Sequence, residues 1–212
     1  CKNRVMSHTN NTFLPSGRID LGTGELALGP LDGRYASVTA PLTNYLSEAA
    51  LNRDRIHVEV EWFIYLCEHE VLPGLSPLSE EQKKGLRAIV TDFNADSVAE
   101  LAEIEAVTVH DVKAVEYYIG RRLEGLGLGH LVPLVHFGCT SEDINNLAYA
   151  LMIRGAVHEV WLPAFEALID DLEALARETA EVPMLSRTHG QAATPTTLGK
   201  EMAVFAHRLG RQ

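Results

Sequence analysis

Apolar side chains recur every three to four residues through most of the chain, and short polar segments rich in glycine or proline separate these stretches. This spacing is that of an amphipathic α-helix. After Pro41 the pattern predicts one long helix that ends at Pro73-Gly74, with an apolar face formed by Leu51, Val58, Trp62, Phe63 and Leu66. Another helix should begin at Ser79-Glu80-Glu81-Gln82, because serine followed three residues later by glutamine forms a capping box.

A glycine-rich break separates two further groups of helices. Before it, Val112, Val115, Ile119 and Leu123 recur at helical spacing. Gly125, Gly127 and Gly129 then interrupt the pattern, so we place a domain boundary near His130. Beyond it, two amphipathic helices are predicted by two apolar sets, first Ile144, Leu147, Ala148, Leu151 and Met152, and then Phe165, Leu168, Ile169, Leu172, Leu175 and Ala176.

The last predicted helix begins at Thr194-Pro195, which suit the N-cap and first helical positions, and carries Leu198, Met202, Phe205 and Leu209. No segment shows sustained strand alternation, so we expect an all-α fold. We divide it into a flexible extension (residues 1–29), an N-terminal helical domain (30–129) and the first long helices of a central bundle domain (130–212). Because the helical pattern runs to Gln212, we expect the bundle to be truncated; a complete small bundle is the alternative.

Charge and cysteine content narrow the classes of function. The formal net charge is −11, which disfavours nucleic acid as a partner, although a few cations and helix N-termini can still bind an anionic small molecule. No apolar run approaches the roughly 20 residues that a membrane-spanning helix needs. Cys1, Cys67 and Cys139 are far apart and include no Cys-x-x-Cys pair, which disfavours disulfides and a zinc site and favours a reducing cytoplasm.

Four polar clusters interrupt the apolar pattern, each in a predicted loop or at a predicted helix start, where functional residues usually lie. They are Asp32-Gly33-Arg34-Tyr35, Thr108-Val109-His110-Asp111, Thr140-Ser141-Glu142-Asp143 and Ser186-Arg187-Thr188-His189-Gly190-Gln191. The first is either an ordinary turn or an anion clamp in which Arg34 and Tyr35 donate to a phosphate. In the third, Thr140 or Ser141 caps the next helix, and the same helix start suits a carboxylate, so the two roles are compatible.

Two clusters contain histidine. His110-Asp111 is a pair that recurs in metal-dependent phosphohydrolases, but the following helix offers only Lys113 and Glu116 nearby, so we expect no metal. The aspartate can instead fix the tautomer of His110 and raise its basicity, which suits proton transfer or phosphate binding. His189 lies in a predicted loop away from any apolar stripe, and is either a plain surface residue or a group that protonates a leaving group near neutral pH.

Together, in this order and at these spacings, the clusters resemble the adenylosuccinate lyase family of the fumarase/aspartase superfamily, from about Leu31 to Gln212. The most specific segments are the Ser186–Gln191 cluster with Pro195 and Gly199-Lys200-Glu201-Met202, and Thr140-Ser141-Glu142-Asp143-Ile144-Asn145-Asn146. His110-Asp111 with Lys113, and Arg34-Tyr35, narrow the resemblance from the superfamily to the family. The sequence departs from the family pattern at Val109, where asparagine is frequent, and at Ala192, where proline is common.

The resemblance implies a C–N lyase without cofactors that eliminates fumarate from adenylosuccinate, a succinyl-nucleotide, in purine nucleotide biosynthesis. It implies a cytoplasmic homotetramer with a central helical bundle and active sites shared between subunits. His189 would be the general acid and His110 would assist next to the nucleotide. The expected binding residues are Arg34 and Tyr35 for the phosphate, Thr140 and Ser141 for the succinyl carboxylates, and His110, Asp111, Lys113 and Gln191 around them.

In this family the base is a serine on a mobile loop well downstream, and nothing after Gln191 resembles that loop, so we expect the 212-residue chain alone to be inactive. The sequence leaves open whether the succinylcarboxamide ribotide is also a substrate, as is common in the family. Two alternatives also remain open. One is another fumarate-releasing member of the superfamily, such as an argininosuccinate lyase. The other is a non-catalytic helical scaffold that binds a nucleotide or a partner protein.

Overall fold

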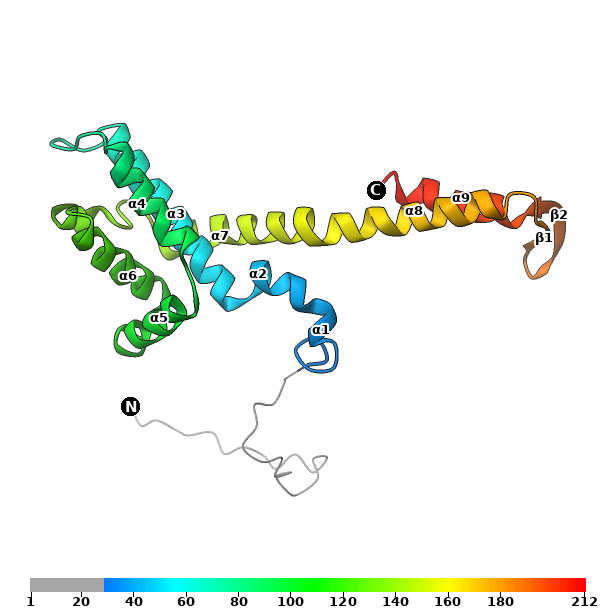
Figure 1. Ribbon diagram of the computed structural model, residues 1–212, viewed down its shortest axis with the longest axis horizontal. Coiled ribbons are helices and arrows are strands. Elements are labelled where there is room, and N and C mark those ends of the chain that lie inside the picture. The colour runs from blue at the N-terminus through cyan, green and yellow to red at the C-terminus, as the bar shows by residue number, and fades with distance from the viewer. Residues whose placement is uncertain (1–28) are drawn as a thin grey trace, which may run out of the picture. The chain divides into compact units, whose positions relative to one another are not determined.

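The computed structural model describes residues 29–212 (Figure 1). The chain forms two compact units, Cys1–Thr39 and Ala40–Gln212. The extension predicted for residues 1–29 lies outside the described residues except for Gly29. In the first unit the described part is a turn followed by the short helix α1 (Ala36–Thr39), and Thr39 Oγ1 donates to the Leu31 carbonyl oxygen at 2.9 Å. The domain boundary near His130 stays a prediction.

The second unit is helical except for one hairpin, so the predicted all-α class is confirmed for the described residues, with a small addition. Its elements are η1 (Ala40–Leu42), α2 (Thr43–Leu46), α3 (Glu48–Glu68), α4 (Glu80–Thr91), α5 (Ala95–Thr108), α6 (Asp111–Gly125), η2 (Gly129–Leu134), α7 (Ser141–Ala156), η3 (Val157–Trp161), α8 (Leu162–Glu178), β1 (Pro183–Thr188), β2 (Gln191–Thr197) and α9 (Leu198–Leu209).

Helices α3 to α6 enclose the main apolar core. The predicted stripe of α6 is buried, and Val115, Ile119 and Leu123 pack with Ile56 and Phe63 of α3. The predicted capping box at the start of α4 is confirmed: the Gln82 amide donates to Ser79 Oγ at 3.2 Å, and the Ser79 amide donates to Gln82 Oε1 at 2.9 Å. The capping box fixes where α4 begins, and the apolar stripe fixes which face α6 presents to the core.

The single long helix predicted from Pro41 is wrong at its N-terminal end. A turn of 3₁₀-helix and the short α2 precede α3, and Ser47 between them has an extended backbone with φ −78° and ψ 164°. Ser47 Oγ accepts the Ala50 amide at 3.1 Å, as an N-cap side chain does. The chain therefore bends at Ser47, because its side chain competes for the amides that a continuous helix would bond internally.

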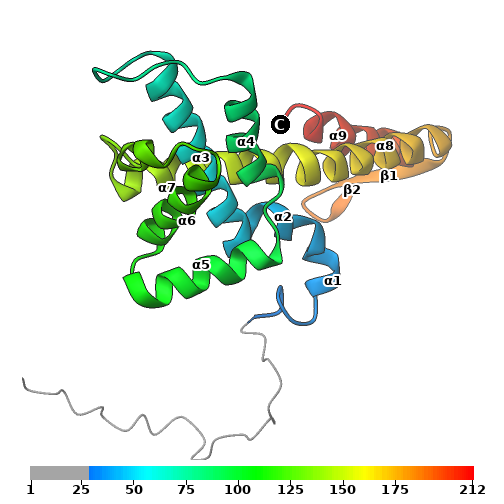
Figure 2. The ribbon, with the colours of Figure 1, turned by 60° about the vertical axis from the view of Figure 1, so that its left-hand side comes forward.

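Helix α7, the π-helical segment η3 and α8 follow one another without a break from Ser141 to Glu178. Helix α7 packs against α3, whereas α9 runs back along α8 in both views (Figures 1 and 2). The predicted α7 stripe is only partly buried: Ile144, Ala148 and Met152 are buried, whereas Leu147 is 57% exposed. The apolar stripe of α8 has no buried residue in the described chain.

The segment before α9 corrects the sequence prediction. Strands β1 and β2 pair antiparallel, with Pro183 opposite Thr197 and Thr188 opposite Gln191, where we expected a loop. Helix α9 begins at Leu198 rather than at Thr194-Pro195, and Thr197 Oγ1 accepts the Lys200 amide at 3.2 Å. Pro195 lies in strand β2 opposite Leu185. The N-cap prediction was wrong because Thr197 offers the same capping chemistry three residues later.

Candidate functional site

Arg34 and Tyr35 lie in the first unit, in the turn that precedes α1. The Tyr35 amide donates to the Pro30 carbonyl oxygen at 2.7 Å, which closes the turn. The Arg34 guanidinium carbon is 5.5 Å from the centroid of the Tyr35 ring, within the range of a cation–π contact. Tyr35 is 46% exposed. Both the ordinary turn and the anion clamp remain consistent with this arrangement.

His110 is the N-cap residue of α6. Its Nδ1 accepts the backbone amide of Lys113 at 3.1 Å, so this nitrogen holds a lone pair and the proton of the neutral ring is on Nε2. His110 Nδ1 is 3.6 Å from the Asp111 carboxylate, beyond hydrogen-bond distance. The expectation that Asp111 fixes the tautomer is therefore wrong, because the Lys113 amide does so. His110 presents an Nε2–H donor at a half-exposed position.

Asp111 instead pairs with a buried arginine. Asp111 Oδ2 accepts from Arg55 at 2.7 Å, and its Oδ1 accepts the Val112 amide at 2.8 Å. Partial burial opposes ionisation of Asp111, but the Val112 amide and the Arg55 guanidinium outweigh it and lower the pKa of the carboxyl. Asp111 is therefore a stable anion that anchors the start of α6.

Arg55 is a node that the sequence patterns did not single out. It is 4% exposed, and besides Asp111 it donates through Nε to Asn145 Oδ1 at 2.9 Å and through its guanidinium to Asn52 Oδ1 at 3.1 Å. These bonds join α3 to the N-terminal ends of α6 and α7. A buried guanidinium needs such partners, because desolvating it without them would cost several kcal/mol. The signal in the sequence was a charged residue on a predicted core helix.

Lys113, another predicted binding residue, is on the exposed side of the first turn of α6. Its Nζ donates to Glu116 Oε2 at 2.6 Å, and this bond raises the pKa of the lysine. Nζ also lies 5.9 Å from the centroid of the Tyr117 ring. The ammonium therefore remains charged next to His110 and Asp111.

Val109 precedes His110 in a strained backbone conformation. Its φ of 50° and ψ of 34° place a β-branched residue in the left-handed region, and its side chain is 87% exposed. Asparagine, which the resemblance leads us to expect here, adopts this conformation more readily. The departure at Val109 thus concerns the backbone turn into His110, and no packed contact offsets its strain.

We expect Val109→Asn in the full-length protein to raise the free energy of unfolding by about 1 kcal/mol, the order of the left-handed penalty that it relieves. Chemical denaturation compared with wild type measures the change. Val107→Asn is the matched control, because Val107 is 84% exposed inside α5, where valine and asparagine have similar helix propensities. An equal effect of both substitutions would contradict a backbone origin.

Thr140 and Ser141 form the start of α7. The Asp143 carboxylate accepts both the Thr140 amide, at 2.8 Å, and Thr140 Oγ1, at 2.9 Å. These two bonds, the amide first, lower the pKa of Asp143. Thr140 is thus the N-cap residue of α7 and forms a capping box with Asp143, while Ser141 occupies the first helical position. Unbonded amides at a helix start attract anions, so the carboxylate role remains compatible with capping.

The segment that leads into Thr140 contains a second histidine in an ordered hydrogen-bond arrangement. His136 has a φ of 63°, and both its Nδ1 and its backbone amide contact the carboxylate of Glu59, which is 1% exposed. The expected site residues did not include either residue. The sequence signal was a glutamate that falls on the buried face of a helix, although its partner could not be identified from spacing.

His189 forms the tip of the β1–β2 hairpin. The loop contains only His189 and Gly190, with φ of 53° and 76°, and two positive values are typical of a type I′ turn. His189 is exposed, and Gln191 follows it as the first residue of β2, also exposed. The turn holds the imidazole outward on a short hairpin whose backbone is hydrogen-bonded on both sides.

The structure brings some predicted site residues together within the second unit and separates others. The Arg55 node connects the α6 start, with His110, Asp111 and Lys113, to the α7 start, with Thr140 and Ser141. His189 and Gln191 lie past the other end of the α7–η3–α8 helix (Figure 1). At about 1.5 Å per residue, a helix from Ser141 to Glu178 spans more than about 50 Å. Within the second unit, one copy of the chain therefore does not bring His189 to the α6 and α7 starts.

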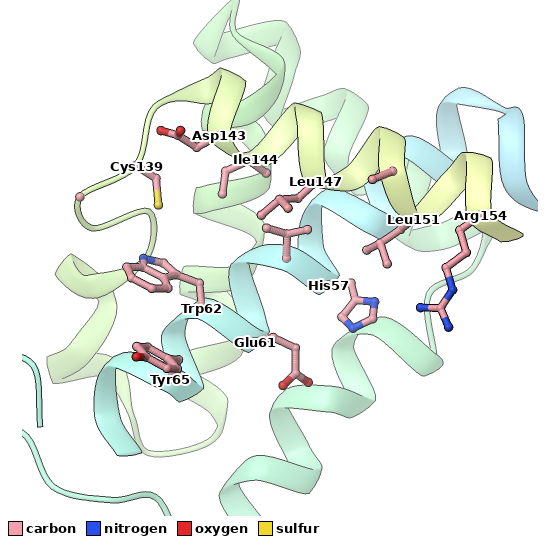
Figure 3. Close-up of a pocket in the computed structure, with 13 residues that line it drawn as sticks. His57, Glu61, Trp62, Tyr65, Cys139, Asp143, Ile144, Leu147, Leu151 and Arg154 are labelled. Carbon is pink, nitrogen blue, oxygen red and sulfur yellow. The ribbon is translucent and has the colours of Figure 1, made fainter. Parts of the chain in front are cut away.

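A groove of about 770 Å³ lies between α3 and α7. In Figure 3, Cys139, Asp143 and Trp62 lie at one end, and His57 and Arg154 lie at the other. Leu147 and Leu151, from the more exposed side of the α7 stripe, form part of its apolar wall. None of the predicted site residues is among its lining residues. Within residues 29–212, no group of three or more His, Cys, Asp or Glu side chains is placed to hold a metal ion.

Solved structures with a similar fold support the helical architecture. Fumarate lyase from Mesorhizobium sp. BNC1 aligns with a TM-score of 0.63 and 22% identity, over 81% of this chain and 38% of that one. β-Carboxy-cis,cis-muconate cycloisomerase from Acinetobacter calcoaceticus sp. ADP1 aligns with a TM-score of 0.63 and 21% identity, over 84% and 40%. At these identities the likeness concerns the fold. Within residues 29–212, no helix is long and apolar enough to span a bilayer.

Sequence relatives give the family. Adenylosuccinate lyase from Haemophilus influenzae is 46% identical over 187 residues, which is 88% of this chain and 41% of the relative. Those from Legionella pneumophila and Escherichia coli are 45% and 43% identical over similar lengths. The chain spans about two fifths of the length of these curated relatives. Residues 33–212 match the family described as Lyase. The expected resemblance to adenylosuccinate lyases is confirmed, and the chain belongs to the lyase family.

Proposed function

We propose that the full-length protein to which this chain belongs is an adenylosuccinate lyase, which eliminates fumarate from adenylosuccinate to give AMP and also cleaves the succinylcarboxamide ribotide in purine nucleotide biosynthesis. The observation that carries the proposal is the 43–46% identity to adenylosuccinate lyases over about 88% of the chain. The two free thiols of the described residues, Cys67 and Cys139, fit a cytoplasmic enzyme.

His189 is the proposed general acid. An amine leaves poorly unless it is protonated as the C–N bond breaks, and an exposed imidazole can deliver that proton near neutral pH. The two-residue turn supports this role because it fixes the backbone on both sides of the ring while leaving the ring free to meet a substrate. Gln191, two positions further along the same hairpin end, would contact the substrate beside it.

The remaining predicted residues would bind the anionic parts of the substrate. Arg34 and Tyr35 suit the phosphate, and the amides and hydroxyls at the α7 start, Thr140 and Ser141, suit the succinyl carboxylates. Loss of a proton next to a carboxylate builds negative charge, which preorganised donors stabilise more strongly in the transition state than in the substrate. His110 would add its Nε2–H donor, with Lys113 as a neighbouring cation.

The separation of His189 from the α6 and α7 starts supports a homotetramer in which each active site takes residues from several subunits. Apolar side chains on α8 and α9 support the same assembly, since Leu168 is 48% exposed and Phe205 is 53% exposed in the single chain. The long helices of the subunits would pack these faces together in a central bundle. In this proposal the base is a serine on a downstream loop. We therefore expect the 212-residue chain alone to release no fumarate.

A substrate comparison tests the proposal. The purified full-length protein should release fumarate from adenylosuccinate with a kcat/KM far above that for argininosuccinate, with both reactions followed by ultraviolet absorbance. The 212-residue chain serves as the inactive control. Preference for argininosuccinate would reassign the enzyme to another branch of the superfamily, and nucleotide binding without turnover would make the protein a scaffold.

A further inference from the structure

Glu59 is a buried acid that the proposed mechanism does not use. Its side chain has no exposed surface, and it lies in the middle of α3, where the neighbouring positions Ile56, Val60 and Phe63 are core residues. Desolvation raises the pKa of Glu59, whereas its contacts with His136 act in the opposite direction. A buried carboxylate is costly to keep, and an apolar residue of the same size would fill the same space more cheaply.

Both oxygens of Glu59 engage one residue. Oε2 accepts the backbone amide of His136 at 3.1 Å, and Oε1 lies 2.5 Å from His136 Nδ1. The carboxylate therefore holds both the main chain and the ring of His136. An ionised carboxylate can only accept, so with Glu59 ionised the nitrogen that faces it carries a proton, and Nε2 is the only ring nitrogen left for another partner.

His136 belongs to the link between η2 and α7 that ends at Thr140. The link contains two residues with positive φ, His136 at 63° and Gly138 at 74°. Helix α3 holds it at a second point, since Trp62 Nε1 donates to the Phe137 carbonyl oxygen at 2.9 Å. Two consecutive residues of a strained link are thus bonded to α3, a few residues before the Thr140–Ser141 helix start.

His110 and His136 are held in opposite tautomers. The Lys113 amide keeps the proton of neutral His110 on Nε2, which makes that atom a donor. Glu59 keeps the proton of neutral His136 on Nδ1, which makes Nε2 an acceptor. The His136 side chain is 15% exposed, so part of the ring still reaches solvent.

We propose that Glu59 is a positioning residue for the lyase reaction: it holds His136 with Nδ1–H turned inward, so that Nε2 faces the substrate, and it fixes the link that sets the Thr140–Ser141 helix start. This inference rests on the proposed function for its effect on catalysis. Its structural half, the tautomer of His136, is independent of any activity.

Glu59→Gln in the full-length protein tests the proposal, because glutamine keeps the shape but has only one acceptor oxygen. With that oxygen on the His136 amide, the glutamine NH₂ faces Nδ1, and the ring must accept there and carry its proton on Nε2. We expect ¹⁵N ring shifts of His136 to change from the Nδ1–H to the Nε2–H pattern, with signals assigned by their absence in His136→Gln. We expect kcat/KM to fall about 10- to 100-fold, by analogy with the loss seen when the partner that orients a metal-ligating histidine is removed, with an altered pH profile.

Glu68→Gln is the matched control. Glu68 lies on the same helix and also binds one backbone amide and one side-chain nitrogen, since it accepts from the Leu78 amide at 3.0 Å and from Lys83 Nζ at 2.8 Å. Glu68→Gln should leave the pH profile and the His136 tautomer unchanged. Glu59→Asp, which keeps the carboxylate, should retain the Nδ1–H tautomer and more activity than Glu59→Gln, and it decides the question if the glutamine variant does not assemble.

The outcomes separate the two proposals. An unchanged His136 tautomer in Glu59→Gln, or equal losses of activity in Glu59→Asp and Glu59→Gln, would overturn the positioning role. A wild-type protein that releases no fumarate would overturn the proposed function instead, while the ring shifts would still report whether Glu59 sets the tautomer.

Discussion

Replacement of His189 by asparagine in the full-length protein is expected to lower kcat by about 10²- to 10⁴-fold, the usual contribution of a general acid. Asparagine is the better substitution because it forms an Asn-Gly pair, the sequence preferred in two-residue type I′ turns. The hairpin should therefore persist, whereas alanine at a φ of 53° would add backbone strain. Steady-state kinetics give the change in kcat, and calorimetric titration with AMP gives nucleotide binding.

Affinity for AMP should change little, since the lost group acts on the breaking bond and not on the phosphate. His207→Asn is the control, because His207 is an exposed histidine on α9 and undergoes the same substitution. If His189→Asn retained wild-type kcat, His189 would be a plain surface residue and another group would have to protonate the departing nitrogen.

Gly199→Ala is expected to be the most destabilising single methyl addition in the α8–α9 pair. An added Cβ would meet the Ala176 carbonyl oxygen and would lie 2.6 Å from Ala180 Cα, and both are backbone atoms that cannot rotate away. The Gly199 amide also donates to the Thr179 carbonyl oxygen at 2.9 Å, which ties the start of α9 to the end of α8. We expect a loss of about 3 kcal/mol or more, at the upper end of overpacking effects.

Urea denaturation measures the loss, and hydrogen exchange should show reduced protection in α9 and the hairpin before other helices. Gly210→Ala at the other end of α9 is the control, because its Cβ would have only one contact as close as 3.4 Å. Its stability should stay near that of wild type. Equal midpoints for the two variants would mean that α9 does not approach α8 as closely as described.

Helices α3, α6, α7 and α8 were predictable because their apolar residues are periodic, and the hairpin was not because its residues lack any such period. Almost every residue of β1 and β2 is exposed, so no alternation of buried and exposed side chains marks the strands. The turn signal was also weak, since His189-Gly190 replaces the more usual Asn-Gly. Thr194-Pro195 has the residue types of a helix start, but α9 begins at Leu198 with Thr197 as its N-cap.

The predicted site residues came from exposed clusters, whereas the residues that hold them are buried and distant in sequence. Glu59 is 77 positions from His136, and Arg55 is 90 positions from Asn145. Periodicity reports which face of a helix is apolar, but it does not report which charged residue on that face meets which partner. For this reason we predicted that Asp111 would orient His110, whereas in the structure Asp111 accepts a hydrogen bond from Arg55.

The π-helical turn Val157–Trp161 changes the rotation of α8 about the helix axis relative to α7. One extra residue per turn rotates everything that follows by about 100° around the helix axis compared with an uninterrupted α-helix. The side of α8 that meets α9 is therefore turned by about this amount from where an uninterrupted α-helix would place it. Deleting one residue from this turn would leave both ends folded but would swing the hairpin, and its imidazole, toward a different neighbour.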